Sequence, residues 1–144
     1  VRGICCLRAG VKGLSENISV RSIVGTFLEH SRIFYFENGG EYEIYMGSAD
    51  WMPRNLDKRV EILFPVEAED LKEEICHILT IQLADTMKAH VMQPDGTYSK
   101  VDRRGKTALN SQMYFCEEAI NNAPATVIEH VAKERVFKPT TPNQ

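Results

Sequence analysis

The chain lacks the features that mark several common classes of protein. No apolar run approaches the length needed to cross a membrane, and no segment resembles a signal peptide. The formal net charge of -3 is no signature of a protein that binds polyanions through its overall charge. The four cysteines do not have the spacing of a zinc site. Any affinity for anions must therefore come from a local arrangement of arginine and lysine side chains.

The 144 residues suit one domain with a sizeable core. The chain begins at Val1, directly inside the apolar run VRGICCL. Natural domains rarely begin in this way, so we expect residues 1–144 to be a single subdomain of a longer protein, truncated at its start. The adjacent Cys5 and Cys6 are expected to be small buried residues of a protein from a reducing compartment.

Apolar alternation predicts strands mainly in the first half of the chain. RIFYF and EYEIYM alternate most clearly, and the Asn-Gly-Gly segment at 38–40 favours a tight hairpin turn between them. Further strands are predicted at VRGICCL, ISVRSIV and KRVEILF. In KRVEILF, Val60 and Phe64 share one face, while Arg59 and Glu61 point together to the other.

Helical periodicity dominates the second half. Residues 69–90 are predicted to form a long helix with an apolar stripe that includes Leu71 and Ile75. QPDGTYSK predicts a short hairpin around Asp95-Gly96, and ALNSQMYFCEEAI predicts a second helix. Asp50 is expected to cap a helical turn within GSADWMPRNLD. The predicted fold class is α/β, a mixed β-sheet with packed helices, with strands mainly in the first half and helices in the second.

Charged residues gather at the ends of the predicted strands, where open sheets tend to bind ligands. They are Arg2, His30, Arg32, Arg54, Arg59 and Glu61. Guanidinium groups fork onto phosphate oxygens and an imidazole carries protons or phosphoryl groups, so the set suits phosphoryl chemistry. Glu61 is predicted to hold the histidine in one tautomer. The alternative is a solvated histidine beside a surface ion pair of Arg59 and Glu61, and the residues alone leave both open.

Other polar and aromatic residues favour structural roles. His77 and His90 on the predicted long helix do not belong to a set of four metal ligands, so we expect no metal site there. Trp51 is predicted to be a packing anchor. The basic loop Arg103-Arg104-Gly105-Lys106 either lines the route of a polyanion or is a solvated turn.

The order of the motifs resembles one half of a phospholipase-D-like site. His30-Ser31-Arg32 comes first, followed by Gly47-Ser48-Ala49-Asp50 and then by Arg54-Asn55 and Arg59-Val60-Glu61. In that superfamily a His-x-Lys pair opens a strand, a Gly-Ser-x-Asn loop follows, and a downstream acid orients the histidine. Here Arg32 stands in place of the lysine and Asp50 in place of the asparagine, which argues against a phosphodiesterase.

A more specific resemblance covers nearly the whole chain. The segments VRGICCLRAG, GLSENI, FLEHSRIFYFENGG, GSADWMPRNLDKRVEI, RRGK and NSQ are similar, in this order, to the carboxy-terminal domain of bacterial polyphosphate kinase. The resemblance implies a phospholipase-D-like fold and makes residues 1–144 a carboxy-terminal catalytic subdomain. It implies reversible transfer of the terminal phosphate of ATP to a growing polyphosphate chain, through a phosphohistidine and with Mg²⁺.

The resemblance also assigns roles to residues. Arg2 resembles an arginine that contacts nucleotide phosphates, and His30 a second histidine that protonates the leaving ADP oxygen or binds phosphate. Arg59 matches an arginine that lines the polyphosphate tunnel. Arg54 and Glu61 come instead from the strand facing and the superfamily pattern, with Arg32 and Asp50 in support. The phosphorylated histidine and the Mg²⁺ ligands are expected in the upstream part.

The implied partners are ATP or ADP, inorganic polyphosphate, the upstream subdomain of the same chain and further copies in a homo-oligomer, with no nucleic acid. The implied location is the cytoplasm, and the family allows peripheral association with the inner membrane. The isolated chain is expected to bind ATP poorly and to be inactive. Two alternatives stay open: a phospholipase-D-like phosphodiesterase, and a non-catalytic module that binds polyphosphate and helps subunits assemble.

Overall fold

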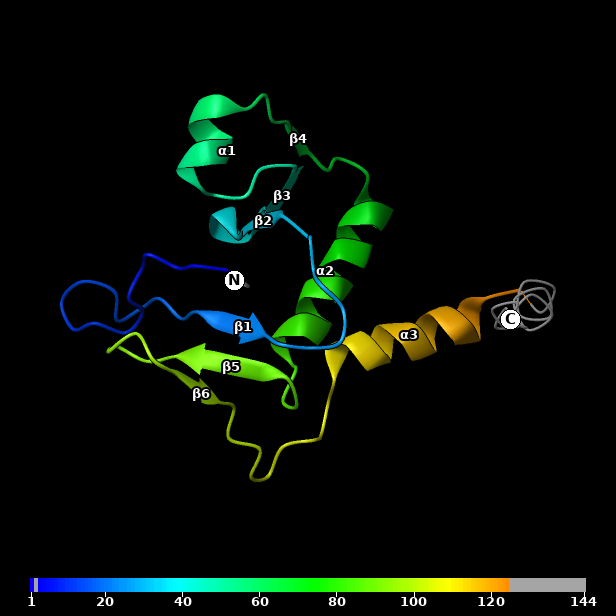
Figure 1. Cartoon of the computed structure of the whole chain (residues 1–144). Coiled ribbons are helices and arrows are strands. Elements are labelled where there is room, and N and C mark those ends of the chain that lie inside the picture. Colours follow the sequence, from blue (N-terminus) through cyan, green and yellow to red (C-terminus); the bar gives the residue numbers. More distant parts are fainter. Residues whose placement is uncertain (2, 125–144) are drawn as a thin grey trace, which may run out of the picture.

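The computed structural model of the chain describes Val1 and residues 3–124, so Arg2 and residues 125–144 lie outside the described residues. The regular elements of these residues are two three-stranded sheets, three α-helices and one 3-10 turn, η1 (Figure 1). In chain order the elements are β1 (Arg21–Ile23), β2 (Ile33–Phe36), η1 (Asn38–Gly40), β3 (Glu43–Gly47), α1 (Pro53–Lys58), β4 (Leu63–Pro65), α2 (Glu69–Leu83), β5 (Ala89–Met92), β6 (Tyr98–Lys100) and α3 (Ser111–Asn122). The α/β class is confirmed, with strands coming mainly before helices. The predicted mixed β-sheet is wrong, because the described strands form two separate sheets in which every pair is antiparallel.

One antiparallel sheet has the strand order β2-β3-β4. The turn between β2 and β3 follows the prediction, because residues 38–40 all have positive φ angles, of 46°, 69° and 105°. Ile33 lies opposite Met46, and Tyr35 lies opposite Ile44, which is 1% exposed. Ile44, Val66 and Ile75 of α2 form the core on this face of the sheet.

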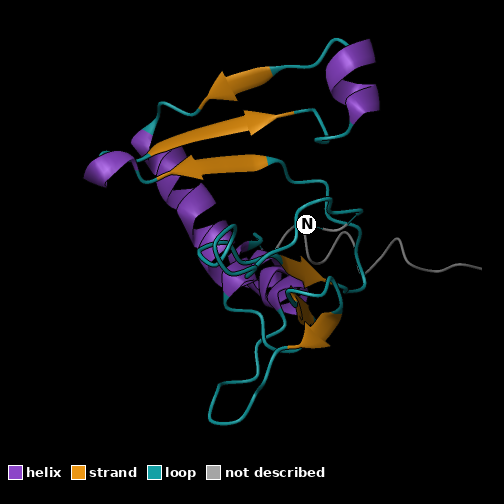
Figure 2. Ribbon diagram, turned by 90° about the vertical axis from the view of Figure 1, so that its left-hand side faces the viewer, coloured by secondary structure: helices purple, strands orange, loops and turns teal. Residues whose placement is uncertain are grey.

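The second antiparallel sheet has the order β1-β5-β6 (Figure 1). Figure 2 shows the two sheets apart from each other, near opposite ends of the long helix. Its β5–β6 hairpin confirms the turn predicted around Asp95-Gly96. Gly96 has a φ of 87°, and the Asp95 carboxylate accepts hydrogen bonds from the backbone amide and hydroxyl of Thr97, at 2.9 and 2.7 Å. A small core of Ala9, Val20 and Met92 lies beside this sheet.

The long helix is shorter than predicted, and this is the main correction to the sequence analysis. α2 ends at Leu83, and residues 89–92 form strand β5 instead of continuing to a helix end at His90. The reason is the carboxylate of Asp85, whose Oδ1 accepts hydrogen bonds from the amides of Met87, Lys88 and Ala89. In a helix those amides would bond to carbonyls one turn earlier, so Asp85 replaces the helical pattern with a turn.

Three predicted strands are wrong in whole or in part. Within ISVRSIV, residues 18–24, only Arg21–Ile23 form a strand. VRGICCL forms no strand: Ile4 is 82% exposed and Cys6 is exposed, while only Cys5 packs partly against the small core. A strand needs a hydrogen-bonded neighbour, and none of the described strands pairs with this segment. Within KRVEILF only Leu63 and Phe64 pair with β3, and Val60 is fully exposed. The predicted buried face of KRVEILF is therefore open, since Val60, Ile62 and Phe64 are all exposed.

The described residues contain no helix that is both long and apolar enough to cross a membrane.

Candidate functional site

His30 lies in the loop between β1 and β2, and its side chain is exposed. Two residues later, at the entry to β2, Arg32 turns back along this loop. Its Nη1 donates a hydrogen bond of 2.9 Å to the backbone carbonyl of His30. Among the described residues the exposed imidazole has no hydrogen-bond partner, while the backbone carbonyl of His30 is bonded to Arg32.

The same arginine joins two of the predicted motifs. Arg32 Nε and Nη2 donate to Asp50 Oδ1 at 3.0 and 2.9 Å, in an ion pair whose side chains are 24% and 50% exposed. The loop of His30 and the Gly-Ser-Ala-Asp loop thus lie together, as the motif order suggested. Asp50 is not the cap predicted for α1: that helix begins after Met52, without a side-chain cap. Its carboxylate is instead bonded to the guanidinium of Arg32.

Glu61 is the centre of a second cluster, which we call the Glu61 rim and define as Ser48, Asn55 and Glu61. Ser48 Oγ donates to Glu61 Oε2 at 2.5 Å, and Asn55 Nδ2 donates to Oε1 at 3.3 Å. Ser48 Oγ also accepts the amide of Ile62 at 3.1 Å, which ties the rim to the start of β4. Asn55 is 2% exposed, and its Oδ1 has no partner among the described residues. The predicted role of Glu61 behind a histidine stays a prediction.

The remaining predicted cations are spread along the same connection. Arg54 lies in α1, and Arg59 follows directly after it; both are exposed. Among the described residues neither guanidinium has a hydrogen-bond or ion-pair partner, so the surface pair of Arg59 with Glu61 does not form there. Arg2 lies outside the described residues.

An apolar pocket of about 380 Å³ adjoins the rim on the outer face of the β2-β3-β4 sheet. Phe34 and Trp51 stack there, with ring centroids 5.4 Å apart and an angle of 22° between the rings. Trp51 is 76% exposed, so its predicted role as a packing anchor is wrong: the indole stacks on Phe34 at the surface of the pocket. The other lining side chains include Phe36, Tyr45, Leu56 and Leu63.

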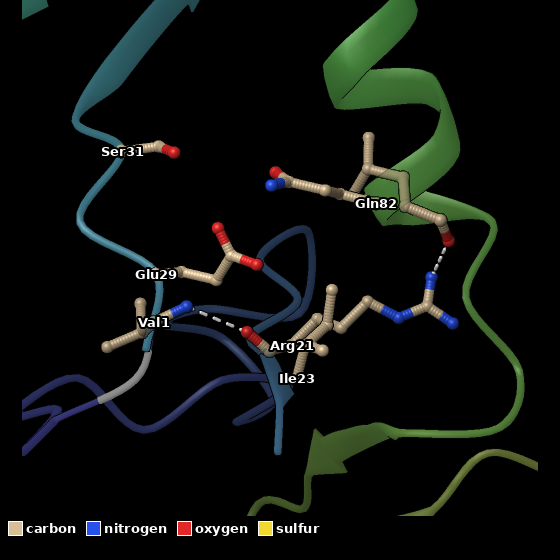
Figure 3. Close-up of a pocket in the computed structure, with 7 residues that line it drawn as sticks. Val1, Arg21, Ile23, Glu29, Ser31 and Gln82 are labelled. Atoms are coloured by element: carbon tan, nitrogen blue, oxygen red, sulfur yellow. Dashed lines mark hydrogen bonds between the residues drawn. The ribbon is translucent and has the colours of Figure 1, made fainter. Parts of the chain in front are cut away.

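A smaller pocket of about 240 Å³ lies between the β1–β2 loop and the end of α2 (Figure 3). Glu29 and Ser31, the two neighbours of His30, line it together with Gln82 of α2. Arg21 closes one side: its guanidinium donates to the carbonyl of Leu83 and, at 3.2 Å, to that of Asp85. These carbonyls lie at and just after the end of α2, so Arg21 donates to acceptors of the helix terminus rather than facing a ligand.

Two residues that the sequence analysis missed hold this region together. Asp85 is fully buried, and besides three amides it accepts the amide and hydroxyl of Ser111, both at 2.8 Å. Burial alone would raise the pKa of Asp85, but the hydrogen bonds outweigh it and lower the pKa below its usual value. Gln112, the next residue of α3, is hydrogen-bonded to Phe27 and Glu29. The contacts of Asp85 with Ser111 and of Gln112 with Phe27 and Glu29 join residues 26 to 85 positions apart, so no local sequence pattern predicts them.

The histidines away from the site have structural contacts, as expected. His77 Nε2 lies 2.9 Å from Glu118 Oε1, joining α2 to α3, and His90 Nδ1 lies 3.1 Å from the carbonyl of Lys88. In the basic loop, Arg104 pairs with Asp102 at 2.6 Å and is 92% exposed. In the part of the chain that the structure describes, no group of three or more His, Cys, Asp and Glu residues is placed to hold a metal ion.

Comparisons with known proteins agree on one family. Residues 1–112 match the family described as polyphosphate kinase C-terminal domain 2. A polyphosphate kinase of Synechocystis sp. is 59% identical over 123 residues, which cover 83% of this chain and 17% of that protein. A polyphosphate kinase of Lactiplantibacillus plantarum is 53% identical over 119 residues, with the same coverage of both chains.

A solved structure gives the same answer for the fold. The crystal structure of polyphosphate kinase from Porphyromonas gingivalis superposes with a TM-score of 0.76 at 38% identity, covering 83% of this chain and 18% of that one. The phospholipase-D-like α/β class predicted from the sequence is therefore confirmed. The chain spans only about a sixth of the length of these relatives. The matched family and these relatives together show that the chain belongs to the polyphosphate kinase family and corresponds to its C-terminal domain 2.

Proposed function

We propose that this chain is part of an enzyme that reversibly transfers the terminal phosphate of ATP to a growing polyphosphate chain. The relatives named above support the reaction, and one observation supports the site. His30 presents an exposed imidazole from a backbone that Arg32, itself paired with Asp50, holds in place. A group that is fixed at its backbone and open at its side chain is suited to act on a bound phosphate.

In this proposal His30 protonates the leaving ADP oxygen or binds a phosphate oxygen. Arg54 and Arg59, whose guanidinium groups are exposed, contact the phosphates together with Arg2. Phosphoryl transfer needs positioning and positive charge around the phosphate oxygens more than covalent help from these residues. Arg32 differs from the lysine of a His-x-Lys pair, because its guanidinium is already bonded to Asp50 and to the carbonyl of His30. We therefore assign it to positioning rather than to phosphate binding.

The other requirements of the reaction fall on residues beyond those described. We propose that the phosphorylated histidine and the ligands of Mg²⁺ belong to an upstream subdomain, since the described residues do not fit a metal. ATP, ADP and polyphosphate as ligands, the facing subdomain, a homo-oligomer and a cytoplasmic location belong to the same proposal.

The test uses the complete polypeptide that carries this chain and compares His30→Ala with the control His90→Ala. We expect His30→Ala to slow ATP-driven polyphosphate synthesis by about 10²- to 10⁴-fold, the usual range for a lost acid or base. Phosphoenzyme should still form, because the nucleophile lies elsewhere. His90→Ala should retain synthesis, since among the described residues the His90 side chain bonds only to the backbone of Lys88.

Three results would contradict the proposal. Synthesis at the wild-type rate in His30→Ala would remove His30 from the site. Hydrolysis of bis(p-nitrophenyl) phosphate by the wild-type protein would favour a phospholipase-D-like phosphodiesterase. Loss of oligomers on deletion of this chain, with transfer intact in His30→Ala, would favour an assembly module.

A further inference from the structure

One buried side chain, that of Gln112, makes three hydrogen bonds to the loop that carries His30. Gln112 is 4% exposed and is the second residue of α3. Its Oε1 accepts the backbone amide of Phe27 at 2.9 Å, and its Nε2 donates to the carbonyl of Phe27 at 2.7 Å. Nε2 also donates to Glu29 Oε1 at 2.8 Å. All three hydrogen bonds thus reach the two residues that lie one and three positions before His30.

Gln112 stands on a rigid base. The residue before it, Ser111, is bonded through its amide and hydroxyl to the buried carboxylate of Asp85. Asp85 in turn accepts hydrogen bonds from the amides of residues 87–89, which lead into β5. The start of α3 is therefore tied to the junction between α2 and β5, and its movement would break several buried hydrogen bonds.

The loop also passes against Gln112 without space to spare. A β-carbon on Gly25 would overlap the side-chain amide of Gln112, so a larger residue there would displace this amide from its present position. Glutamine suits the position because one amide group supplies both an acceptor and donors, and so matches both polar groups of the Phe27 backbone. Glutamate has the same shape but no donor.

We infer that Gln112 is a positioning residue, which sets the backbone before His30 while Arg32 holds the carbonyl of His30 itself. The inference rests on the proposed role of His30. Two anchors, one buried and one at the surface, then fix where the imidazole meets its phosphate. A displacement of about 1 Å in such a group is enough to cost about a hundredfold in rate.

The experiment measures polyphosphate synthesis in the complete polypeptide with Gln112→Glu, Gln112→Met and the control Gln93→Glu. Gln93 also donates from its amide, to Val91 and Ser99, but in the distant β5–β6 hairpin. We expect either change at Gln112 to lower kcat about ten- to a hundredfold. Gln93→Glu should leave kcat unchanged. Gln112→Met keeps the length of the side chain and so guards against a variant that fails to fold around a new charge.

A double-mutant cycle separates positioning from general damage. If Gln112 acts through His30, then Gln112→Glu should cost less than about twofold in a His30→Ala background. Equal losses in both backgrounds would overturn the inference, because a merely structural defect multiplies with any other. Adding Glu29→Gln to Gln112→Glu should recover part of kcat, since the new amide restores one donor and acceptor pair.

Hydrogen exchange gives a readout that does not depend on activity. In Gln112→Glu the amides of residues 24–30 should exchange faster than in the wild type, with the rest of the chain unchanged. Unchanged protection in this loop would overturn the inference whatever the kinetics show. Wild-type synthesis in His30→Ala would instead refute the proposed function, whereas a slow His30→Ala beside a normal Gln112→Glu would refute this inference alone.

Discussion

Two regions each gather hydrogen-bond donors around one carboxylate: the Asp85 junction, formed by Asp85 with residues 87–89 and Ser111, and the Glu61 rim. The two carboxylates differ in their burial and in the number of donors that reach them. Asp85 is fully buried, and five hydrogen bonds of 2.7 to 3.1 Å reach its two oxygens. Glu61 is partly exposed and accepts from two side chains, at 2.5 and 3.3 Å. Beneath it the buried Oδ1 of Asn55 has no partner among the described residues.

The difference shows what each carboxylate can do. The five donors leave Asp85 little capacity for a new partner, so it serves as a joint that connects α2, β5 and α3. Glu61 keeps free acceptor positions and lies at the edge of a pocket. Glu61 can therefore accept a further hydrogen bond from a ligand, whereas Asp85 only stabilises the part of the fold against which the His30 loop packs.

The largest effect on stability should come from breaking the junction. Asp85→Ala leaves five donors without their acceptor in a buried place, and each such group costs about 1–3 kcal/mol. We expect a loss of at least about 3 kcal/mol in the free energy of unfolding, measured by urea unfolding followed by circular dichroism. Asp95→Ala is the control, since that carboxylate only bonds Thr97 in an exposed turn. A loss for Asp85→Ala no larger than for this control would contradict the account of the junction.

A smaller effect should come from breaking the rim. Glu61→Ala removes the acceptor of Asn55 Nδ2 and of the Ser48 hydroxyl, and water reaches the second of these. We expect a loss of about 1–2 kcal/mol in the free energy of unfolding, and about half of that for Glu61→Gln, which keeps one oxygen. Synthesis measured on the same variants tests the predicted role of Glu61 in orienting a histidine. If synthesis is normal in Glu61→Ala, that role is excluded and the rim is structural.

The smallest effect on stability should come from the surface anchor of the loop. Asp50→Asn weakens a partly exposed ion pair with Arg32, and such pairs contribute about 1 kcal/mol or less. The loss should shrink further at high salt, because ions screen exposed charges. Urea unfolding at low and high salt checks this, with Asp102→Asn, which faces Arg104 in the basic loop, as the matched exposed pair. A salt-independent loss as large as that of Asp85→Ala would erase the contrast between the two regions.

Much of the local structure follows from the sequence because it depends on near neighbours. The hairpin of β2 and β3 follows from alternation around the Asn-Gly-Gly segment, and α3 from its apolar spacing. The meeting of the His30 loop with the Gly-Ser-Ala-Asp loop also agrees with the motif order, although the contact is made by Arg32 and Asp50. The family assignment rests on such segments as well, since their order is a property of the chain.

Some predictions failed where a distant partner decides the outcome. Acidic residues at the start of residues 69–90, with Lys88 and His90 at the end, are typical of one long helix. Asp85 takes the amides of residues 87–89 instead and is itself held by Ser111, 26 residues away. VRGICCL has the composition of a strand, but a strand forms only beside a partner, and the described residues provide none.

The sequence by itself determined the elements with a local period, the turns that need positive φ and the family to which the chain belongs. Only the tertiary structure decided where α2 ends, which face of each sheet is covered and how the His30 loop is held. The bonds from Gln112 to Phe27 join residues 85 apart in the chain. Neither residue type nor spacing specifies such a contact, because its geometry exists only once α3 has packed against the junction at Asp85.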